Sequence, residues 1–383
     1  MHFTLSEEQL ALQDTLRRFM ARDYAFERRR AVARTEEGFS RETWSRFAEL
    51  GLLTLPFPEE YGGLGGTDVD LMLVMEQFGR GLVLEPYLAA VVLAGGLVHY
   101  AGSPAQKRAL LPAIGGGGLI MALAHYEPDV RYELSRVASS ARADGGGYVL
   151  NGAKAVVVGG HVADTLLVSA RTDGGERDED GISLFLVDLG ATGLTVRGYP
   201  TQDGARASEV TLENVRVTEE AMVGPKGGAL AHIERAIDRA TAALCAEAVG
   251  IMAALNEATL EFLKTRKQFG QPIGRFQALQ HRMADMVIAA EQSRSMATLA
   301  AVRAGAQDAG ARRRAVSAAK AYVGQSARSV GQAAVQLHGG MGVVDELIVS
   351  HYFKRLTMIN AMFGDADHHL GRFSDLLLAE APA

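Results

Sequence analysis

The sequence predicts an α+β multidomain protein with a helical N-terminal domain, a middle β-barrel or β-sandwich domain and a C-terminal four-helix bundle. The first observation is that the apolar spacing changes from a helical period to a strand period and back again. The second is that glycine clusters at Gly115–Gly118 and Gly227-Gly228 coincide with these changes. The third is the length: 383 residues are too many for one ordinary core. We therefore expect domains at residues 1–118, 119–227 and 228–383.

The N-terminal domain opens with a helix signal. Ser6 followed by Gln9 forms a capping-box pattern, and Leu10, Leu12 and Leu16 then lie on or near one helix face. Helical spacing continues to about residue 113. These features predict helices throughout this domain, with the single tryptophan, Trp44, in its core.

The middle domain is predicted from short apolar runs separated by polar turns that contain glycine. Asn151-Gly152 lies between two such runs and is typical of a two-residue hairpin turn, because Asn-Gly tolerates positive φ angles. Further β runs follow at residues 165–169, 182–187, 194–197 and 209–217. Strands this short and this regularly spaced favour a small barrel or sandwich.

The C-terminal domain shows helical spacing at greater length. Ile233, Ile237, Leu244 and Ile251 recur at steps of three and four within one helix expected over residues 231–267. Similar patterns at residues 277–302, 312–337 and 344–378 complete a four-helix bundle. The first helix is apolar around much of its circumference, so we expect burial on more than one side and an oligomer built through the bundle.

Composition excludes several classes of protein. Thirty-nine Lys and Arg residues against 45 Asp and Glu give a net charge of −6, which argues against nucleic-acid and membrane-surface binding. The only cysteine, Cys245, excludes a disulfide framework and a cysteine-rich zinc site, and the histidines lack metal-ligand spacing, so we expect no metal. The first five residues show no secretory signal, and the longest apolar stretch, residues 88–98, is too short to cross a bilayer. We expect a cytoplasmic protein.

Two segments of the bundle carry candidate chemistry. Residues 266–277 join two long helices, and there Arg266 offers a guanidinium for phosphate and Phe269 a flat face for a planar ring. Residues 336–342 place Gly339 and Gly340 at a helix end, where main chain can approach a ligand closely. The ordinary alternatives are an inter-helix turn and a helix C-cap. None of the glycine-rich segments fits the dinucleotide fingerprint or the P-loop.

These two segments resemble motifs of the acyl-CoA dehydrogenase family. The resemblance in domain order and length covers essentially the whole chain. The family pattern Arg-Lys-x-Phe-Gly-x-x-Ile-x-x-Phe-Gln is matched in full by residues 266–277, and Gln-x-x-Gly-Gly-x-Gly by residues 336–342. The resemblance implies that the ADP half of FAD is held by Arg266, Phe269, Gln277, Gln336, Gly339 and Gly340. That FAD is bound mainly by a neighbouring subunit. Residues 243–250, 351–357 and 363–369 resemble the small subunit of pimeloyl-CoA dehydrogenase and its bacterial relatives.

The resemblance also implies a carboxylate base, and the chain departs from the family there. The usual position of the Glu falls on Gly364, and the minority position falls on Ala240. Asp365 and Asp238 lie nearby, and Asp365 is the weak candidate for a displaced base. We favour the alternatives that Asp365 caps a turn and that Asp238 is a solvated helix residue, because a displaced carboxylate misses the geometry that proton removal requires.

The β domain departs from the family as well. The family's Ala-Leu-Thr-Glu-Pro begins here as Ala122-Leu123 but lacks the hydroxyl that contacts the flavin ring. Val156 stands where the family has the tryptophan that covers the flavin, whereas Gly152 and Lys154 of the same strand match the family. The groups that a subunit uses for its own flavin are thus lost, while those that it lends to a neighbour's flavin are intact.

The resulting expectation is FAD-linked α,β-dehydrogenation of an acyl-CoA by a heteromeric enzyme of fatty acid β-oxidation, in which this chain supplies no base. One alternative is a homo-oligomeric acyl-CoA dehydrogenase with an atypical base, and another is a non-catalytic structural partner. The expected partners are the acyl-CoA, a second subunit of the family and an electron-transferring flavoprotein. We favour a long, polar-ended or bulky acyl chain, such as a dicarboxylyl thioester.

Overall fold

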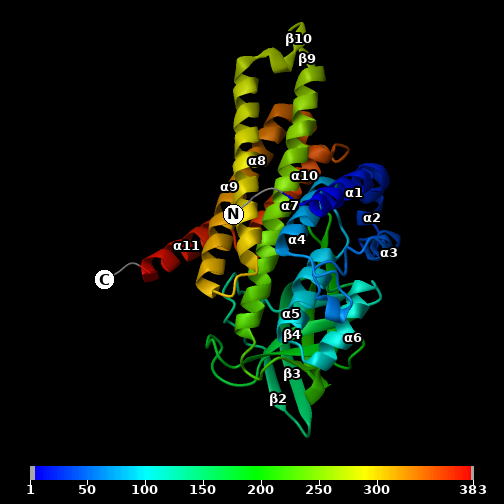
Figure 1. Ribbon diagram of the computed structural model, residues 1–383, viewed down its shortest axis with the longest axis vertical. Coiled ribbons are helices and arrows are strands. Elements are labelled where there is room, and N and C mark those ends of the chain that lie inside the picture. The colour runs from blue at the N-terminus through cyan, green and yellow to red at the C-terminus, as the bar shows by residue number, and fades with distance from the viewer. Residues whose placement is uncertain (1–4, 381–383) are drawn as a thin grey trace. The chain divides into compact units, whose positions relative to one another are not determined.

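The computed structural model describes residues 5–380 (Figure 1). The first four residues, on which the expectation of no secretory signal partly rests, lie outside this range. The described chain divides into two compact units. One comprises the chain up to Ala31, Asp68–Val83 and the chain from Thr241 onward, and the other comprises Val32–Thr67 and Leu84–Ala240.

The N-terminal part is helical, as predicted. The Ser6 hydroxyl accepts from the Gln9 backbone N–H and the Gln9 amide oxygen accepts from the Ser6 backbone N–H, so the capping box is confirmed. Trp44 is buried, and its indole N–H donates to the carbonyl of Gly117. The helices are α1 (Glu7–Asp23), α2 (Phe26–Ala33), α3 (Arg41–Glu49), α4 (Asp68–Gly81), α5 (Gly96–Ala101) and α6 (Pro104–Gly115), with a buried π-helix, η2 (Leu88–Gly95), and a 3₁₀ turn, η1 (Glu59–Tyr61).

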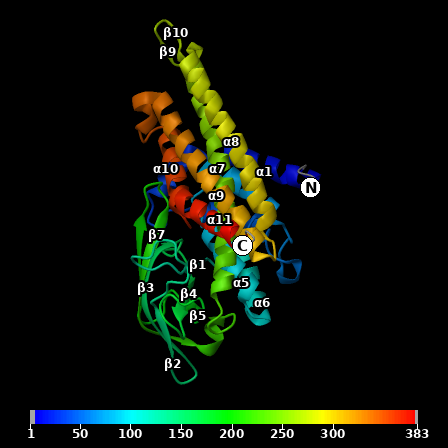
Figure 2. The ribbon, with the colours of Figure 1, turned by 90° about the vertical axis from the view of Figure 1, so that its left-hand side faces the viewer.

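The middle part is one curved sheet of eight strands, seen in Figure 2. The strand order is β6-β7-β3-β2-β4-β5-β8, with β1 parallel to β4 and most other pairs antiparallel. Residues of β1 to β5 and β7 share one apolar core, in which the rings of Tyr148 and Phe185 lie 5.1 Å apart. The strands are β1 (Met121–Ala124), β2 (Ser140–Ala143), β3 (Gly147–Val158), β4 (Thr165–Arg171), β5 (Ile182–Asp188), β6 (Leu194–Pro200), β7 (Arg206–Thr218) and β8 (Met222–Val223), with a 3₁₀ turn, η3 (Glu219–Ala221).

The predicted hairpin at Asn151-Gly152 is wrong, because both residues lie inside the single strand β3. The register against β7 shifts between Leu150 and Gly152, so the glycine forms a bulge with φ +149° instead of a turn. The amide oxygen of Asn151 accepts from the backbone N–H of Asn214 across the sheet. Pairing with a strand 60 residues away in sequence has overridden the local turn preference.

The C-terminal part consists of long helices, with α7 and α8 side by side in both views (Figures 1 and 2). The helices are α7 (Leu230–Thr265), α8 (Gln277–Ala304), α9 (Ala309–His338), α10 (Ile348–Ala361) and α11 (Ala366–Glu380). α7 is long and apolar enough to cross a membrane, but 72% of its most apolar window is buried inside the protein, as in the core helix of a soluble protein.

The single helix predicted over residues 344–378 is wrong, because it is divided into α10 and α11. Phe363 and Gly364 adopt φ angles of +56° and +116°, which end α10 and begin a turn. The apolar spacing happens to continue through the turn, so periodicity alone did not reveal the break.

Candidate functional site

The connection between α7 and α8 projects from the end of the helix pair (Figure 1). Its short strands β9 (Lys267–Gln268) and β10 (Gln271–Pro272) pair around a two-residue turn, Phe269-Gly270. Phe269 has φ +52°, a strained conformation for a bulky residue, and its ring is 89% exposed. The 3₁₀ turn η4 (Ile273–Arg275) then leads into α8. The ring of Phe269 meets its neighbour Phe276 edge-to-face, with centroids 6.0 Å apart, so most of this aromatic surface on a strained turn is available to another molecule.

Arg266 and Gln277 stand at the two ends of this connection, and both are exposed. Arg266 closes α7 through its backbone N–H, which donates to Phe262. Its guanidinium makes no recorded ion pair or side-chain hydrogen bond within residues 5–380. The side chain is therefore available to an anion from outside the chain.

The end of α9 carries the second segment, which continues into the 3₁₀ turn η5 (Gly339–Val343). Gly339 has φ +60° and ends the helix, so the C-cap alternative accounts for this residue. Gly340 is different: its φ is not positive, and an added Cβ would meet no atom within 4 Å in the described part of the chain. Gly342, by contrast, packs against the carbonyl of Val335, where an added Cβ would lie at 2.6 Å. The fold thus accounts for Gly339 and Gly342, but not for Gly340.

The two segments meet at one end of the bundle. The imidazole of His338, directly before Gly339, stacks on the ring of Phe262, one turn before Arg266, with centroids 4.3 Å apart. His338 also bonds through Nδ1 to the carbonyl of Ala334, and burial lowers its pKa. The helix ends that carry the two sequence motifs are therefore adjacent, although the motifs are 70 residues apart in sequence.

The turn between α10 and α11 carries the residues predicted at the usual base position. Gly364 is buried, and an added Cβ would lie 2.5 Å from Cδ2 of His368 and 2.6 Å from Nε2 of His369. Asp365 caps α11, because its carboxylate accepts from the backbone N–H of His368 at 2.9 Å. This is the helix-capping role expected for Asp365.

Side chains from α9 and α11 bind the carbonyls of this turn. Lys320 is fully buried and donates to the carbonyls of Asn360, Met362 and Gly364 at 3.0, 2.9 and 2.5 Å. Burial lowers the pKa of Lys320 to about 8. His369 bonds through Nε2 to the carbonyl of Phe363, and burial, assisted by the Lys320 charge, lowers its pKa to about 3, so it is neutral.

The minority base position offers no carboxylate either. Ala240 lies fully buried on α7. Asp238 is only 1% exposed, so the expectation that it is a solvated helix residue is wrong. Nothing in the apolar spacing of this helix revealed that an aspartate was enclosed.

The β sheet contains a buried polar cluster that the sequence reasoning missed. Nζ of Lys154 lies 2.7 Å from a carboxylate oxygen of Glu127 and also donates to Ser169. Glu127 accepts from the backbone N–H groups of Ala138 and Ser139, and although burial opposes ionisation, Lys154 and these bonds lower its pKa. The signal was present as Glu127-Pro128, two residues beyond the place where the family's Glu-Pro was sought.

Three models of one protein family match the chain in order: the acyl-CoA dehydrogenase N-terminal domain over residues 6–118, the middle domain over 122–215 and the C-terminal domain over 228–375. The chain belongs to the acyl-CoA dehydrogenase family. It is therefore an FAD-dependent oxidoreductase whose substrate class is acyl-CoA. The three-part architecture predicted from the sequence is confirmed.

Relatives and solved structures agree with this family. A probable acyl-CoA dehydrogenase of Bacillus subtilis, YngJ, is 32% identical over 351 residues, which cover 90% of this chain and 91% of the relative. A structure of a variant of the steroid ACAD Tcur3481–Tcur3483 has a TM-score of 0.87 and 32% identity, covering 98% of this chain and 99% of that one. The ChsE4–ChsE5 complex of Mycobacterium tuberculosis has a TM-score of 0.89 and 29% identity over the full length of both chains.

Two regions of this acyl-CoA dehydrogenase differ in how well their residues fit a bound FAD. Open space at Gly340 and the outward-facing Arg266 and Phe269 fit a bound nucleotide, because phosphate and an aromatic ring can approach them without displacing other residues. In the sheet, the residue at the family's tryptophan position is Val156, which is 52% exposed and has φ +53°. A β-branched residue rarely adopts this angle, so the strained bulge remains although the aromatic cover is absent.

Proposed function

We propose that this chain is the subunit of a heteromeric acyl-CoA dehydrogenase that contributes to an FAD site but supplies no catalytic base. The observation that carries the proposal is the turn at Gly364. The resemblance aligns the family's Glu with Gly364, and imidazoles fill the space that a side chain there would enter. Asp365, the nearest carboxylate, already accepts the N–H of His368.

In the reaction, a carboxylate of the partner subunit removes the proton from Cα of the acyl-CoA. A bound FAD would supply the acceptor for the hydride that leaves Cβ. The role of this chain is to bind. Arg266 pairs with the pyrophosphate, Gly339 and Gly340 allow main-chain approach, Phe269 stacks on a planar ring, and Gln277 and Gln336 offer amides for polar contacts. Electron-transferring flavoprotein is the proposed electron acceptor, and the cytoplasm the proposed location.

The substrate proposal is a long or bulky acyl chain. Support comes from two similar structures, one of a steroid ACAD and the other of a two-component complex, and from the resemblance to the small subunit of pimeloyl-CoA dehydrogenase. A steroid is bulkier than a simple short acyl chain, and a dicarboxylyl chain has a more polar end. Steroid-bearing, dicarboxylyl and unbranched acyl-CoA substrates should be compared in one assay, and we expect the unbranched one to turn over slowest.

The decisive experiment is to purify the chain alone and together with a family member that retains its Glu. We expect the lone chain to be nearly inactive, since a positioned base contributes about 10²–10⁴-fold. The co-purified complex should hold FAD and oxidise acyl-CoA. A lone chain that is yellow and active would instead establish the homo-oligomeric alternative. A complex whose flavin content does not respond to Arg266→Ala would favour the structural partner.

A further inference from the structure

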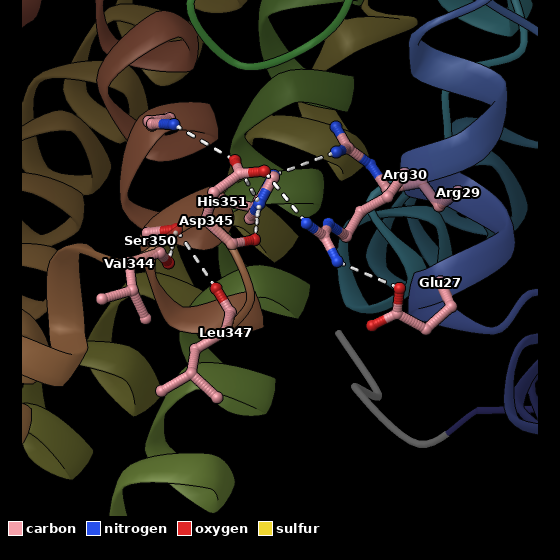
Figure 3. Close-up of polar contacts among 9 residues, drawn as sticks. Glu27, Arg29, Arg30, Val344, Asp345, Leu347, Ser350 and His351 are labelled. Atoms are coloured by element: carbon pink, nitrogen blue, oxygen red, sulfur yellow. Dashed lines mark hydrogen bonds and ion pairs between the residues drawn. The ribbon is translucent and has the colours of Figure 1, made fainter.

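The loop that follows the glycine segment is held by a network of charged side chains from the N-terminal helix α2 (Figure 3). Asp345 lies between η5 and α10, and its carboxylate accepts from Arg30 at 3.1 Å. Arg30 in turn bonds Glu27 one helical turn earlier, at 3.0 Å. Lys354 of α10 lies 3.9 Å from the same carboxylate. All these residues belong to one compact unit.

His351 completes the network, and its bonds define its tautomer. NH1 of Arg29 lies 3.2 Å from Nδ1, and because a guanidinium only donates, Nδ1 carries no hydrogen. Nε2 therefore carries the hydrogen and donates to the backbone carbonyl of Asp345 at 3.0 Å. Arg29 is itself fixed by its bond to the carbonyl of Leu82, just beyond α4. Both the carboxylate and the backbone of Asp345 are thus attached to α2.

This attachment constrains the glycine segment, because the stretch of chain between Gly340 and Asp345 is short. Only four residues separate Gly340 from Asp345. Within them, Gly342 packs against Val335, and the carbonyl of Val344 accepts from the Ser350 hydroxyl at 2.9 Å. The upstream end is fixed by α9. The path of the main chain at Gly339 and Gly340 is therefore set from both sides, and the downstream side depends on Asp345.

We propose that Asp345 is a positioning residue for the flavin site, which holds the Gly339–Val343 turn in its nucleotide-binding conformation through Arg30, His351 and Arg29. The inference rests on the proposed function, since it assumes that this turn binds the ADP half of FAD. Asp345 is half exposed, and Arg30, which is only 17% exposed, keeps its ion pair with Glu27 when Asp345 is lost, so the pair with Asp345 contributes little to global stability. Loss of Asp345 should therefore act on cofactor affinity more than on unfolding.

The test uses the complex with its partner, stripped of flavin and titrated with FAD. Asp345→Asn and, independently, Arg30→Gln should each weaken FAD binding about tenfold, and the double variant should be no weaker than either. Asp345→Glu should restore part of the affinity, because it keeps the charge. The matched control is Glu257→Gln, which removes an ion pair of the same unit, with Arg80 at 2.6 Å, that involves no residue of the segment from Gly339 to Leu347.

Two results would overturn the inference. In the first, Arg266→Ala weakens FAD binding while Asp345→Asn and Arg30→Gln leave it unchanged. The proposed function then stands and the positioning role is wrong. In the second, Asp345→Asn lowers the unfolding temperature of the flavin-free complex well beyond Glu257→Gln with unchanged affinity, so Asp345 is merely structural. If none of the variants, Arg266→Ala included, changes FAD binding, it is the proposed function that fails.

Discussion

Two loops of the helical bundle, η5 and the turn between α10 and α11, use glycine for opposite reasons. At Gly364 the surrounding side chains leave no room for a Cβ, and Lys320 and His369 bind the neighbouring carbonyls. At Gly340 there is open space, and nothing among residues 5–380 requires glycine. A glycine explained by internal packing needs no ligand, whereas one left unexplained within a nucleotide-binding family pattern is a candidate for close approach by another molecule. The comparison separates a position that is closed by packing from one that is open.

The largest expected effect tests this contrast directly with matched variants. Gly364→Ala introduces overlaps at 2.5 and 2.6 Å and an unfavourable positive φ, so we expect it to cost about 2–4 kcal/mol of unfolding free energy. Gly340→Ala should change that free energy by less than about 0.5 kcal/mol. Urea unfolding measures both. Equal losses in the two variants would remove the distinction between the loops.

The next effect concerns the open loop and its neighbour. Arg266→Ala should weaken FAD retention by roughly ten- to a hundredfold, since a charge-assisted hydrogen bond is worth about 1.5–3 kcal/mol. Stability should not change, because Arg266 is exposed and makes no recorded side-chain bond within residues 5–380. Flavin content of the complex after gel filtration provides the measurement. Full retention would mean that the bundle end does not bind the cofactor.

A smaller effect should appear on acidification. Burial and the Arg29 charge lower the pKa of His351, while Asp345 and Lys354 also face it. As the pH falls below about 6.5, the unfolded chain takes up a proton on this ring and the folded chain does not, so stability is lost toward the lowered pKa. Between pH 7.5 and 5.5, His351→Gln should therefore lose less unfolding free energy than wild type. Identical pH profiles in urea unfolding would contradict the neutral tautomer.

The smallest expected effect is at the closed loop. Asp365→Asn should leave turnover within about twofold, because asparagine caps a helix as well as aspartate does and the proposed function assigns the base to the partner. Steady-state kinetics of the complex, with bound flavin checked in parallel, measures this. Abolished turnover with flavin and CoA still bound would identify Asp365 as the base.

Local patterns in the sequence revealed most elements but not the contacts between distant ones. The capping box at Ser6 and the long bundle helices follow from neighbouring residues, and they were predictable. Asn151-Gly152 was misread because strand pairing decides its conformation. The Arg29–His351 bond joins residues 322 positions apart, and no periodicity reports such a pair. The same holds for Gly364, whose closed surroundings depend on side chains from two helices.

Because the ring of Phe269 is exposed, limited proteolysis at this residue should report whether the chain is assembled with a partner. Chymotrypsin cleaves after aromatic residues, and exposed loop tips are preferred sites of cleavage. A turn of two residues between β9 and β10 presents this ring at 89% exposure in the lone chain. Covering by a partner subunit or nucleotide should slow cleavage there while other sites keep their rates. The time course of two fragments, divided near residue 269, would then follow assembly without any enzymatic assay.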